Sequence, residues 1–85
     1  MNRELVVMDL KNIAAQAIRV DNDGPLCFEL RPPIKVKHLE TDQIFHIVLI
    51  GLGGHLTNLV KTKEANDWVP VKEFRLWNHV PHNHK

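Results

Sequence analysis

The sequence predicts a small single α+β domain, with four to five short strands in a mixed or antiparallel sheet and one or two helices. Three observations lead to this fold class. The chain has 85 residues, the size of one domain. Apolar residues near the start recur every three to four positions, which is typical of a helix. Further along, several short segments alternate apolar and polar residues, which is typical of strands.

The helix is expected close to the N-terminus. Apolar residues fall on one helical face there, at Val6, Leu10, Ile13, Ala14, Ala17 and Ile18. Because alanine favours helix, the first interpretation is a helix over residues 10–19. The alternative is a strand at Leu5–Leu10 followed by a shorter helix. The run Asp21–Pro25 predicts the turn that comes next, since Asn, Asp and Gly tolerate positive φ and proline stops a helix.

Three strands are expected in the middle of the chain. Residues 26–30 alternate, and Pro32-Pro33 ends this strand or places it at a sheet edge. Residues 34–37 alternate again and predict a second short strand. The run Ile44–Ile50 is the best strand candidate, because it is almost continuously apolar and is bounded by polar residues and glycines. Such a run suits a central strand buried on both faces.

The segment from His55 to Trp68 has two interpretations. In one, Leu56, Leu59 and Val60 mark one side of a helix. In the other, Thr57–Thr62 is a strand and residues 64–67 form a hairpin turn. The choice matters, because a helix here permits parallel pairing of the strands on either side, whereas a hairpin makes the sheet antiparallel.

The last strand is expected over residues 69–77, which alternate in polarity. Pro70 places its start at a sheet edge, because proline has no N–H for a ladder. Residues 79–85 are polar and are expected to form a flexible tail. Together with this tail, residues 1–85 are expected to form a single domain.

Composition narrows the function classes. A net charge of +1 is a weak electrostatic footprint, so nucleic acid is not expected as a partner. The longest apolar stretch, residues 44–52, is too short to span a bilayer, so no membrane partner is expected. Glu4 does not fit a secretory signal, and a lone Cys27 permits no internal disulfide. A cytoplasmic location is therefore expected, with Cys27 a buried reduced thiol.

A glycine cluster comes after the expected central strand, at Gly51, Gly53 and Gly54. Glycines after a buried strand let backbone N–H groups approach a phosphate, and the start of a following helix favours its charge. The structural alternative is a tight turn or bulge, in which glycine supplies a positive φ.

Residues 45–54, Phe-His-Ile-Val-Leu-Ile-Gly-Leu-Gly-Gly, resemble the first strand and ATP-binding turn of the ThiF/MoeB family and of ubiquitin-activating enzymes. The resemblance extends over residues 44–85. It implies a truncated Rossmann-like α/β fold in which strand 44–50 pairs in parallel with strand 71–77 through a helical crossover.

The same resemblance implies an ATP site. Gly51, Gly53 and Gly54 would approach the phosphates, and Asn78 stands where the family has a ribose-binding acid. Leu56 takes the place of the third glycine, so the implied function is that of a degenerate or truncated nucleotide-binding domain.

Histidines cluster in the tail, at His79, His82 and His84. Neutral imidazoles this close can share a divalent metal. A structural metal site usually has four ligands held by packed elements, and no cysteine lies nearby. The expected state is therefore a solvated tail without a metal.

Aromatic side chains mark the end of the chain, at Trp68, Phe74 and Trp77. Tryptophan is enriched at interface hot spots, and an edge strand can pair with a second copy or with another protein. Cations are interleaved with acids, at Arg31, Lys35, Lys37, Lys61, Lys63, Lys72 and Arg75. Alternation places Lys35 and Lys37 on one face, and an ordinary solvated sheet surface is the expected result.

The sequence favours a small non-enzymatic protein-interaction or accessory module that self-associates and has no cofactor. It contains no serine and no tyrosine, which removes Ser-His-Asp chemistry and a tyrosine acid or nucleophile. A domain of this size gains stability from burying more surface against a partner. The alternative is a ThiF-like nucleotide-binding domain with ATP as its ligand.

Overall fold

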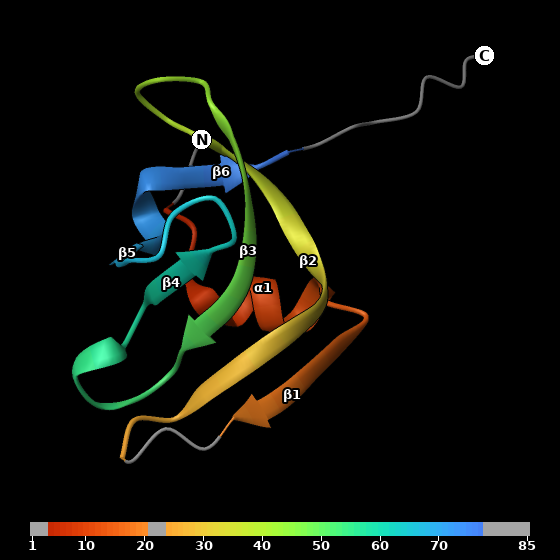
Figure 1. Cartoon of the computed structure of the whole chain (residues 1–85), viewed down its shortest axis with the longest axis vertical. Helices are drawn as coiled ribbons and strands as arrows, with labels where there is room; N and C mark the ends of the chain where they lie inside the picture. Colours follow the sequence, from red (N-terminus) through yellow and green to blue (C-terminus); the bar gives the residue numbers. More distant parts are fainter. Residues whose placement is uncertain (1–3, 21–23, 78–85) are drawn as a thin grey trace.

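The computed structural model describes residues 4–20 and 24–77. Within these ranges the chain forms one α-helix and a six-stranded antiparallel sheet, so the α+β prediction is confirmed (Figure 1). The elements are α1 (Val7–Ile13), β1 (Gln16–Val20), β2 (Cys27–His38), β3 (Ile44–Gly51), β4 (Leu59–Thr62), β5 (Trp68–Pro70) and β6 (Phe74–Leu76). Two 3-10 turns complete the set, η1 (Gly54–Leu56) and η2 (Val71–Glu73). No helix in the described ranges is long and apolar enough to cross a membrane.

The long strand β2 organises the sheet. β3 pairs with both halves of β2, along one edge. On the other edge, β1 pairs with the first half of β2 over Cys27–Arg31, and β6 pairs with its end over Val36–His38. β4 pairs with β3, and β5 pairs with β4. Every pairing is antiparallel, and the strands β1 to β5 are neighbours in chain order, whereas β6 returns to pair with β2.

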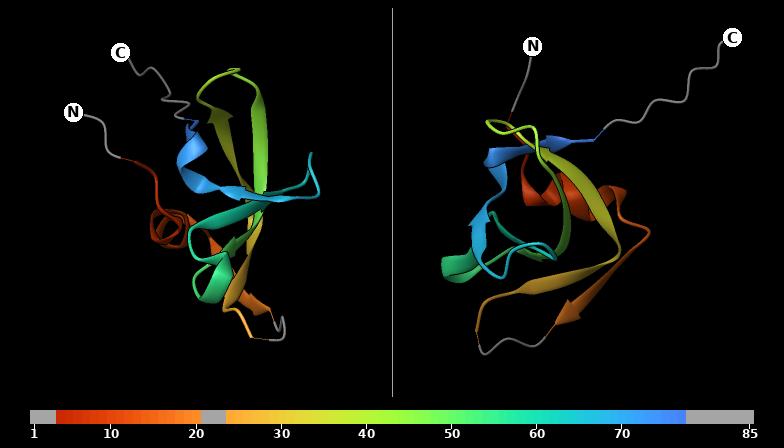
Figure 2. Two further views of the ribbon diagram at one scale, coloured as in Figure 1. Left: turned by 90° about the vertical axis from the view of Figure 1, so that its left-hand side faces the viewer. Right: turned by 45° about the horizontal axis from the view of Figure 1, so that its top comes forward.

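β2 bends where its prolines lie. Glu29 pairs with Leu49 and Ile34 pairs with Ile47, so four residues of β2, 30–33, lie opposite one residue of β3. Such a bulge bends the strand and increases its twist. Pro32-Pro33 fits this position because proline cannot donate to a ladder. The sheet therefore curls, and Figure 2 shows its two halves turning around a common interior.

The core lies inside the curled sheet and is closed by α1. Val7 and Leu10 of the helix are buried against apolar side chains of the strands and of η2, namely Leu30, Val36, Ile47, Ile50, Val60, Val71 and Phe74. The helix is anchored at its start, because the backbone N–H of Val7 donates to Asn58 Oδ1 over 3.2 Å. Cys27 is buried and is not in a disulfide, as the sequence predicted.

The predicted helix over residues 10–19 is wrong in its position. The helix spans Val7–Ile13, and residues 16–20 form β1 instead. All five residues of β1 pair with β2, from Gln16 opposite Arg31 to Val20 opposite Cys27. Ladder pairing thus overrides the helical preference of the alanines.

Two strand boundaries also differ from expectation. The strands predicted at 26–30 and 34–37 are one strand, β2, which continues through the prolines. The strand predicted at 69–77 is split into β5 and β6 by η2, which turns Val71 into the core. The run at 44–50 is confirmed as β3, although several of its side chains are only half-buried.

The hairpin interpretation of residues 57–67 is confirmed. β4 and β5 form an antiparallel pair, with Leu59 opposite Pro70 and Lys61 opposite Trp68. The Rossmann-like alternative required β3 to pair in parallel with the last segment, and that pairing is absent from the described sheet. A parallel crossover needs a dozen or more residues, usually with a helix, and the hairpin uses this length of chain instead.

Candidate functional site

The glycine cluster forms a closed turn between β3 and β4. A Cβ atom on Gly51 would stand 2.1 Å from the carbonyl oxygen of Leu56, so the turn's own backbone occupies the space beside this glycine. Asn58 N–H donates to the Gly51 carbonyl over 3.1 Å. Gly54 has a φ of +61°, which favours glycine.

This geometry accounts for two of the three glycines, Gly51 by close packing and Gly54 by its positive φ. The element after the turn is the three-residue η1, and not a helix whose N-terminus could hold a phosphate. Gly53 is extended, with a φ of −149°, and a Cβ there would make ordinary contacts. The proposed nucleotide role of the cluster stays a prediction, and Asn78 lies outside the described residues.

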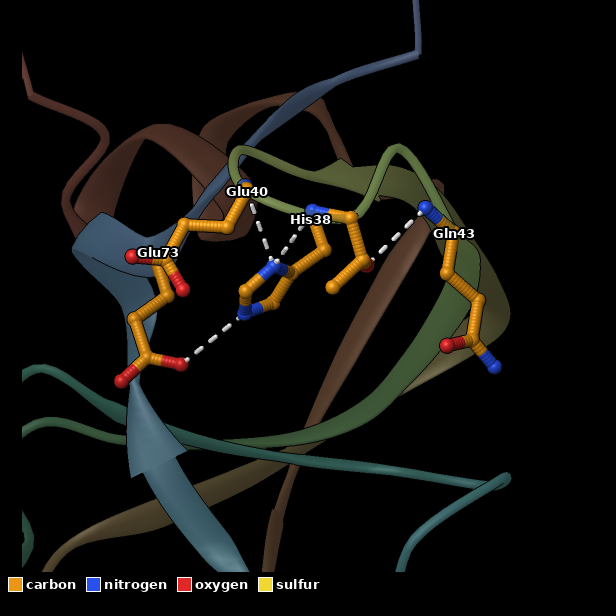
Figure 3. Close-up of polar contacts among 5 residues, drawn as sticks. His38, Glu40, Gln43 and Glu73 are labelled. Atoms are coloured by element: carbon orange, nitrogen blue, oxygen red, sulfur yellow. Dashed lines mark hydrogen bonds and ion pairs between the residues drawn. The ribbon is translucent and has the colours of Figure 1, made fainter.

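His38 forms a hydrogen-bonded cluster at the turn after β2 (Figure 3). Its Nδ1 accepts the backbone N–H groups of Glu40 and Thr41 at 3.2 and 3.4 Å. The ring proton is therefore on Nε2, which donates to Glu73 Oε1 over 3.2 Å. In addition, the backbone N–H of Leu39 donates to the Glu73 carbonyl at 2.9 Å.

The His38 cluster borders a shallow cleft of about 320 Å³, lined also by Leu39 and Lys72. A histidine beside a carboxylate in a cleft is an arrangement that enzymes use for proton transfer. Here both ring nitrogens are already engaged, one by turn amides and one by Glu73. His38 is thus a structural link that fixes the β2–β3 turn to η2. The sequence gives no signal that His38 and Glu73 are partners, because they are 35 positions apart.

A second histidine–carboxylate pair joins β3 to the turn after β4. Glu64 accepts the backbone N–H of His46 at 2.8 Å and its Nδ1–H at 2.5 Å. Burial raises the pKa of Glu64, but the hydrogen bonds from the His46 side chain and backbone outweigh it and leave the pKa below its usual value.

Positive charge gathers around Trp77, where β6 ends beside β2. The Nζ atoms of Lys37 and Lys35 lie 4.6 and 5.8 Å from the centre of the Trp77 ring. Arg75 is the cross-strand partner of Lys37, so both side chains point to the same face of the sheet. We call these four residues the Trp77 face: Lys35, Lys37, Arg75 and Trp77.

Three of the acids that are interleaved with these cations in the sequence pair with other residues. Glu29 pairs with Arg31 at 3.1 Å, Glu64 with His46, and Glu73 with His38. Among the described residues, no carboxylate stands within ion-pair distance of any of the three cations of the Trp77 face. The shared orientation of Lys35 and Lys37 is confirmed, and the face gathers three positive charges without an ion pair among the described residues.

The three aromatic residues predicted as one interface are separated by the fold. Phe74 is in the core, with an exposure of 4%, and contacts His38 and Phe45 edge-on. Trp68 is half-buried on β5, where Lys61 Nζ lies 5.3 Å from its ring centre. Only Trp77 stays substantially exposed, at 38%.

The free edge of β1 is the longest unpaired strand edge in the described sheet. β1 has five residues and pairs with β2 alone. Its side chains are exposed or half-exposed, and the exposed apolar Ile18 stands at its centre. An unpaired row of backbone N–H and C=O groups is a template for another strand.

No family model, no curated protein and no solved structure matches the chain. The resemblance to ThiF/MoeB proteins therefore stays a prediction that rests on residues 44–54 and the segment after them. Among the residues that the structure describes, no group of three or more His, Cys, Asp or Glu side chains could hold a metal. His79, His82 and His84 lie outside the described ranges.

Proposed function

We propose that this chain is a small non-enzymatic interaction module that works as a homodimer, in which the β1 strands of two copies pair side by side. The observation that carries the proposal is the unprotected edge of β1. Proteins usually blunt a strand edge with proline, with charge, with shortness or with a covering element. Within residues 4–20 and 24–77, β1 has none of these devices except a single charged residue, Arg19.

The other two edges of the sheet are protected. β5 has three residues and ends in Pro70, which cannot donate to a partner strand. β6 also has three residues, and α1 lies alongside it across a groove of about 420 Å³ whose lining includes Asn12 and Leu76. The contrast singles out β1 as the edge at which this small domain could bury more surface.

Symmetry fixes how two β1 strands would pair. A two-fold dimer brings the same patch of each copy together, and antiparallel pairing of all five residues places the axis at the middle residue. That residue is Ile18. Each Ile18 then lies directly opposite its own copy, and Ala17 lies opposite the partner's Arg19. The pairing would extend the two sheets into one and shield both isoleucines from water.

The expected dimer is weak, because one short strand pair buries less than the roughly 1,200 Å² of a standard interface, and dissociation in the range of about 1–100 µM would fit. We place the module in a reducing compartment, the cytoplasm. The single cysteine of the sequence, the buried Cys27, supports that placement.

Disulfide trapping tests the pairing. In Ile18→Cys the two thiols face each other across the axis, with Cα atoms about 4.5–5.5 Å apart, which suits a disulfide. In the matched variant Arg19→Cys the two residues are diagonal neighbours about 7–8 Å apart, beyond easy bridging. We expect mild oxidation to give a covalent dimer of Ile18→Cys and far less of Arg19→Cys. The wild type, with only the buried Cys27, gives the baseline.

Equal cross-linking of the two variants would show random collision instead of a fixed register. If Ile18→Cys gave no cross-linked dimer at concentrations where the protein associates, the interface would not be at β1.

A further inference from the structure

We propose that the Trp77 face binds single-stranded nucleic acid, with a base stacked on the exposed indole and phosphates held by Lys35, Lys37 and Arg75. This site does not depend on the dimer, because β6 and β1 pair with opposite ends of β2. The net charge of +1 is a sum over the whole chain, so it is compatible with a local cluster of positive charge that binds nucleic acid.

The charge arrangement is the first argument. Lys37 and Arg75 stand directly opposite each other in the β2–β6 ladder. Like charges at directly opposite positions destabilise a sheet. Among the described residues, neither side chain forms an ion pair with a carboxylate, and Glu4 and Asp9, which line the same groove as Arg75, do not approach it to ion-pair distance. A chain of phosphates would supply the missing counter-charge, and its binding would release the counterions that now screen these side chains.

The exposed tryptophan is the second argument, and it selects the class of polyanion. The indole of Trp77 is 38% exposed, and the ammonium groups of Lys35 and Lys37 lie over its ring, so it presents aromatic surface beside positive charge. Unpaired bases stack on such surfaces whatever their sequence, because every base has a π-face. An acidic peptide would use the cations and gain nothing comparable from the ring. A duplex keeps its bases stacked inside and would gain nothing from the ring either.

The spacing of the cations fits an extended strand. Lys35 and Lys37 are two residues apart on one strand, which separates their Cα atoms by about 6.6–6.8 Å along β2. Arg75 lies on the adjacent strand, about 5 Å to the side of Lys37. A single-stranded backbone that runs along β2 can therefore meet the lysines in succession while a base turns towards Trp77.

The test is fluorescence anisotropy of the full chain with a fluorescein-labelled oligothymidylate of about 12 nucleotides, within the site size of small single-strand binders. Three phosphate contacts predict that the logarithm of the association constant falls with the logarithm of salt concentration at a slope of about −2. Trp77→Ala is expected to weaken binding about 5- to 150-fold, which corresponds to the loss of one base–aromatic stack.

Matched lysine variants locate the site. Lys37→Gln should reduce the salt slope by about 0.7, the share of one phosphate contact on a single strand. Lys61→Gln is the control, because Lys61 makes the same kind of contact with Trp68 at a different edge of the sheet. It should leave both affinity and slope unchanged. All three side chains are on the surface, and circular dichroism confirms that each variant is folded.

Three results would overturn the proposal. The first is no binding at low salt up to millimolar protein. The second is binding that Trp77→Ala does not weaken, or that Lys61→Gln weakens as much as Lys37→Gln does. The third is equal competition by poly-L-glutamate or by a duplex of the same length, which would assign the face to acidic peptides or to unspecific polyanion contact.

Discussion

Replacing Gly51 by alanine tests whether the glycine turn is shaped by packing. The added Cβ would stand 2.1 Å from the carbonyl oxygen of Leu56 and 2.7 Å from its Cβ. These atoms belong to the backbone or are fixed to it, so no side-chain rotation relieves the clash. Overpacking costs about 1–3 kcal/mol where neighbours can adjust, and we expect about 3 kcal/mol here. An 85-residue domain has about 4–13 kcal/mol in total, so the loss is severe.

Thermal unfolding followed by circular dichroism measures the effect. A loss of about 3 kcal/mol lowers Tm by about 12–24 °C in a domain of this size. Gly53→Ala is the matched control two residues away, because its Cβ would lie 3.4 Å from Leu26 Cβ and its φ suits any residue. We expect its Tm to stay within about 4 °C of the wild type. A Gly51→Ala protein that melts as the wild type does would refute the packing explanation.

Three further variants test individual hydrogen bonds and charges at the surface. The pKa of Glu64 is lowered in the folded state, so its stabilising contribution is present at neutral pH and is lost as the pH falls from the unfolded value of about 4.3 through the folded one. Glu64→Gln should therefore make urea stability less sensitive to acid, and an unchanged pH profile would contradict the contact with His46. Arg75→Glu turns the repulsion with Lys37 into attraction and should add about 0.2–1 kcal/mol of stability at low salt while weakening oligothymidylate binding. A loss of stability in urea would contradict the cross-strand placement. His38→Phe keeps the aromatic contacts but removes the acceptor of two exposed turn amides, and we expect it to cost about 0.5–1.5 kcal/mol in thermal melts. A melt within error of the wild type would mean that the ring does not hold the turn.

The fold class and the central strand could be predicted because their signals are local. β3 is an uninterrupted apolar run between polar residues and glycines, and little else fits such a pattern. The hairpin after it remained open between two interpretations, since Leu56, Leu59 and Val60 satisfy a helical period as well as a strand. In the structure β4 pairs with β3, which excludes the helix, and a short stretch of sequence does not reveal which strands pair.

Errors arose where a distant partner overrides a local preference. Ala17 and its neighbours favour helix, yet residues 16–20 pair with β2 along their whole length. Apolar and polar residues alternate across residues 69–77, which predicts one strand. The chain instead forms a 3-10 turn in which Val71 is buried in the core. Pro32-Pro33 suggested an end of a strand, whereas a bulge lets β2 continue through both prolines.

The candidate surfaces also combine features that are visible in a short stretch of sequence with features that depend on distant contacts. Trp77 was identified as an interface residue from its type and position, and it is exposed. Its grouping with Lys37 and Arg75 depends on β6 lying beside β2, a contact between segments far apart in the chain. The free edge of β1 could not be foreseen, because four of its five residues, 16–19, fall within the helix predicted over residues 10–19.

Sedimentation equilibrium over a range of concentrations tests the central claim, that two copies associate through β1, most directly. The wild type should move from the mass of one chain towards that of two as concentration rises. Ile18→Lys places two ammonium groups opposite each other on the axis and should stay monomeric, whereas Ile13→Lys, at a more exposed apolar position on α1, should behave as the wild type does. A wild type that is monomeric at every practical concentration would contradict the claim, as would an Ile18→Lys variant that associates as strongly as the wild type.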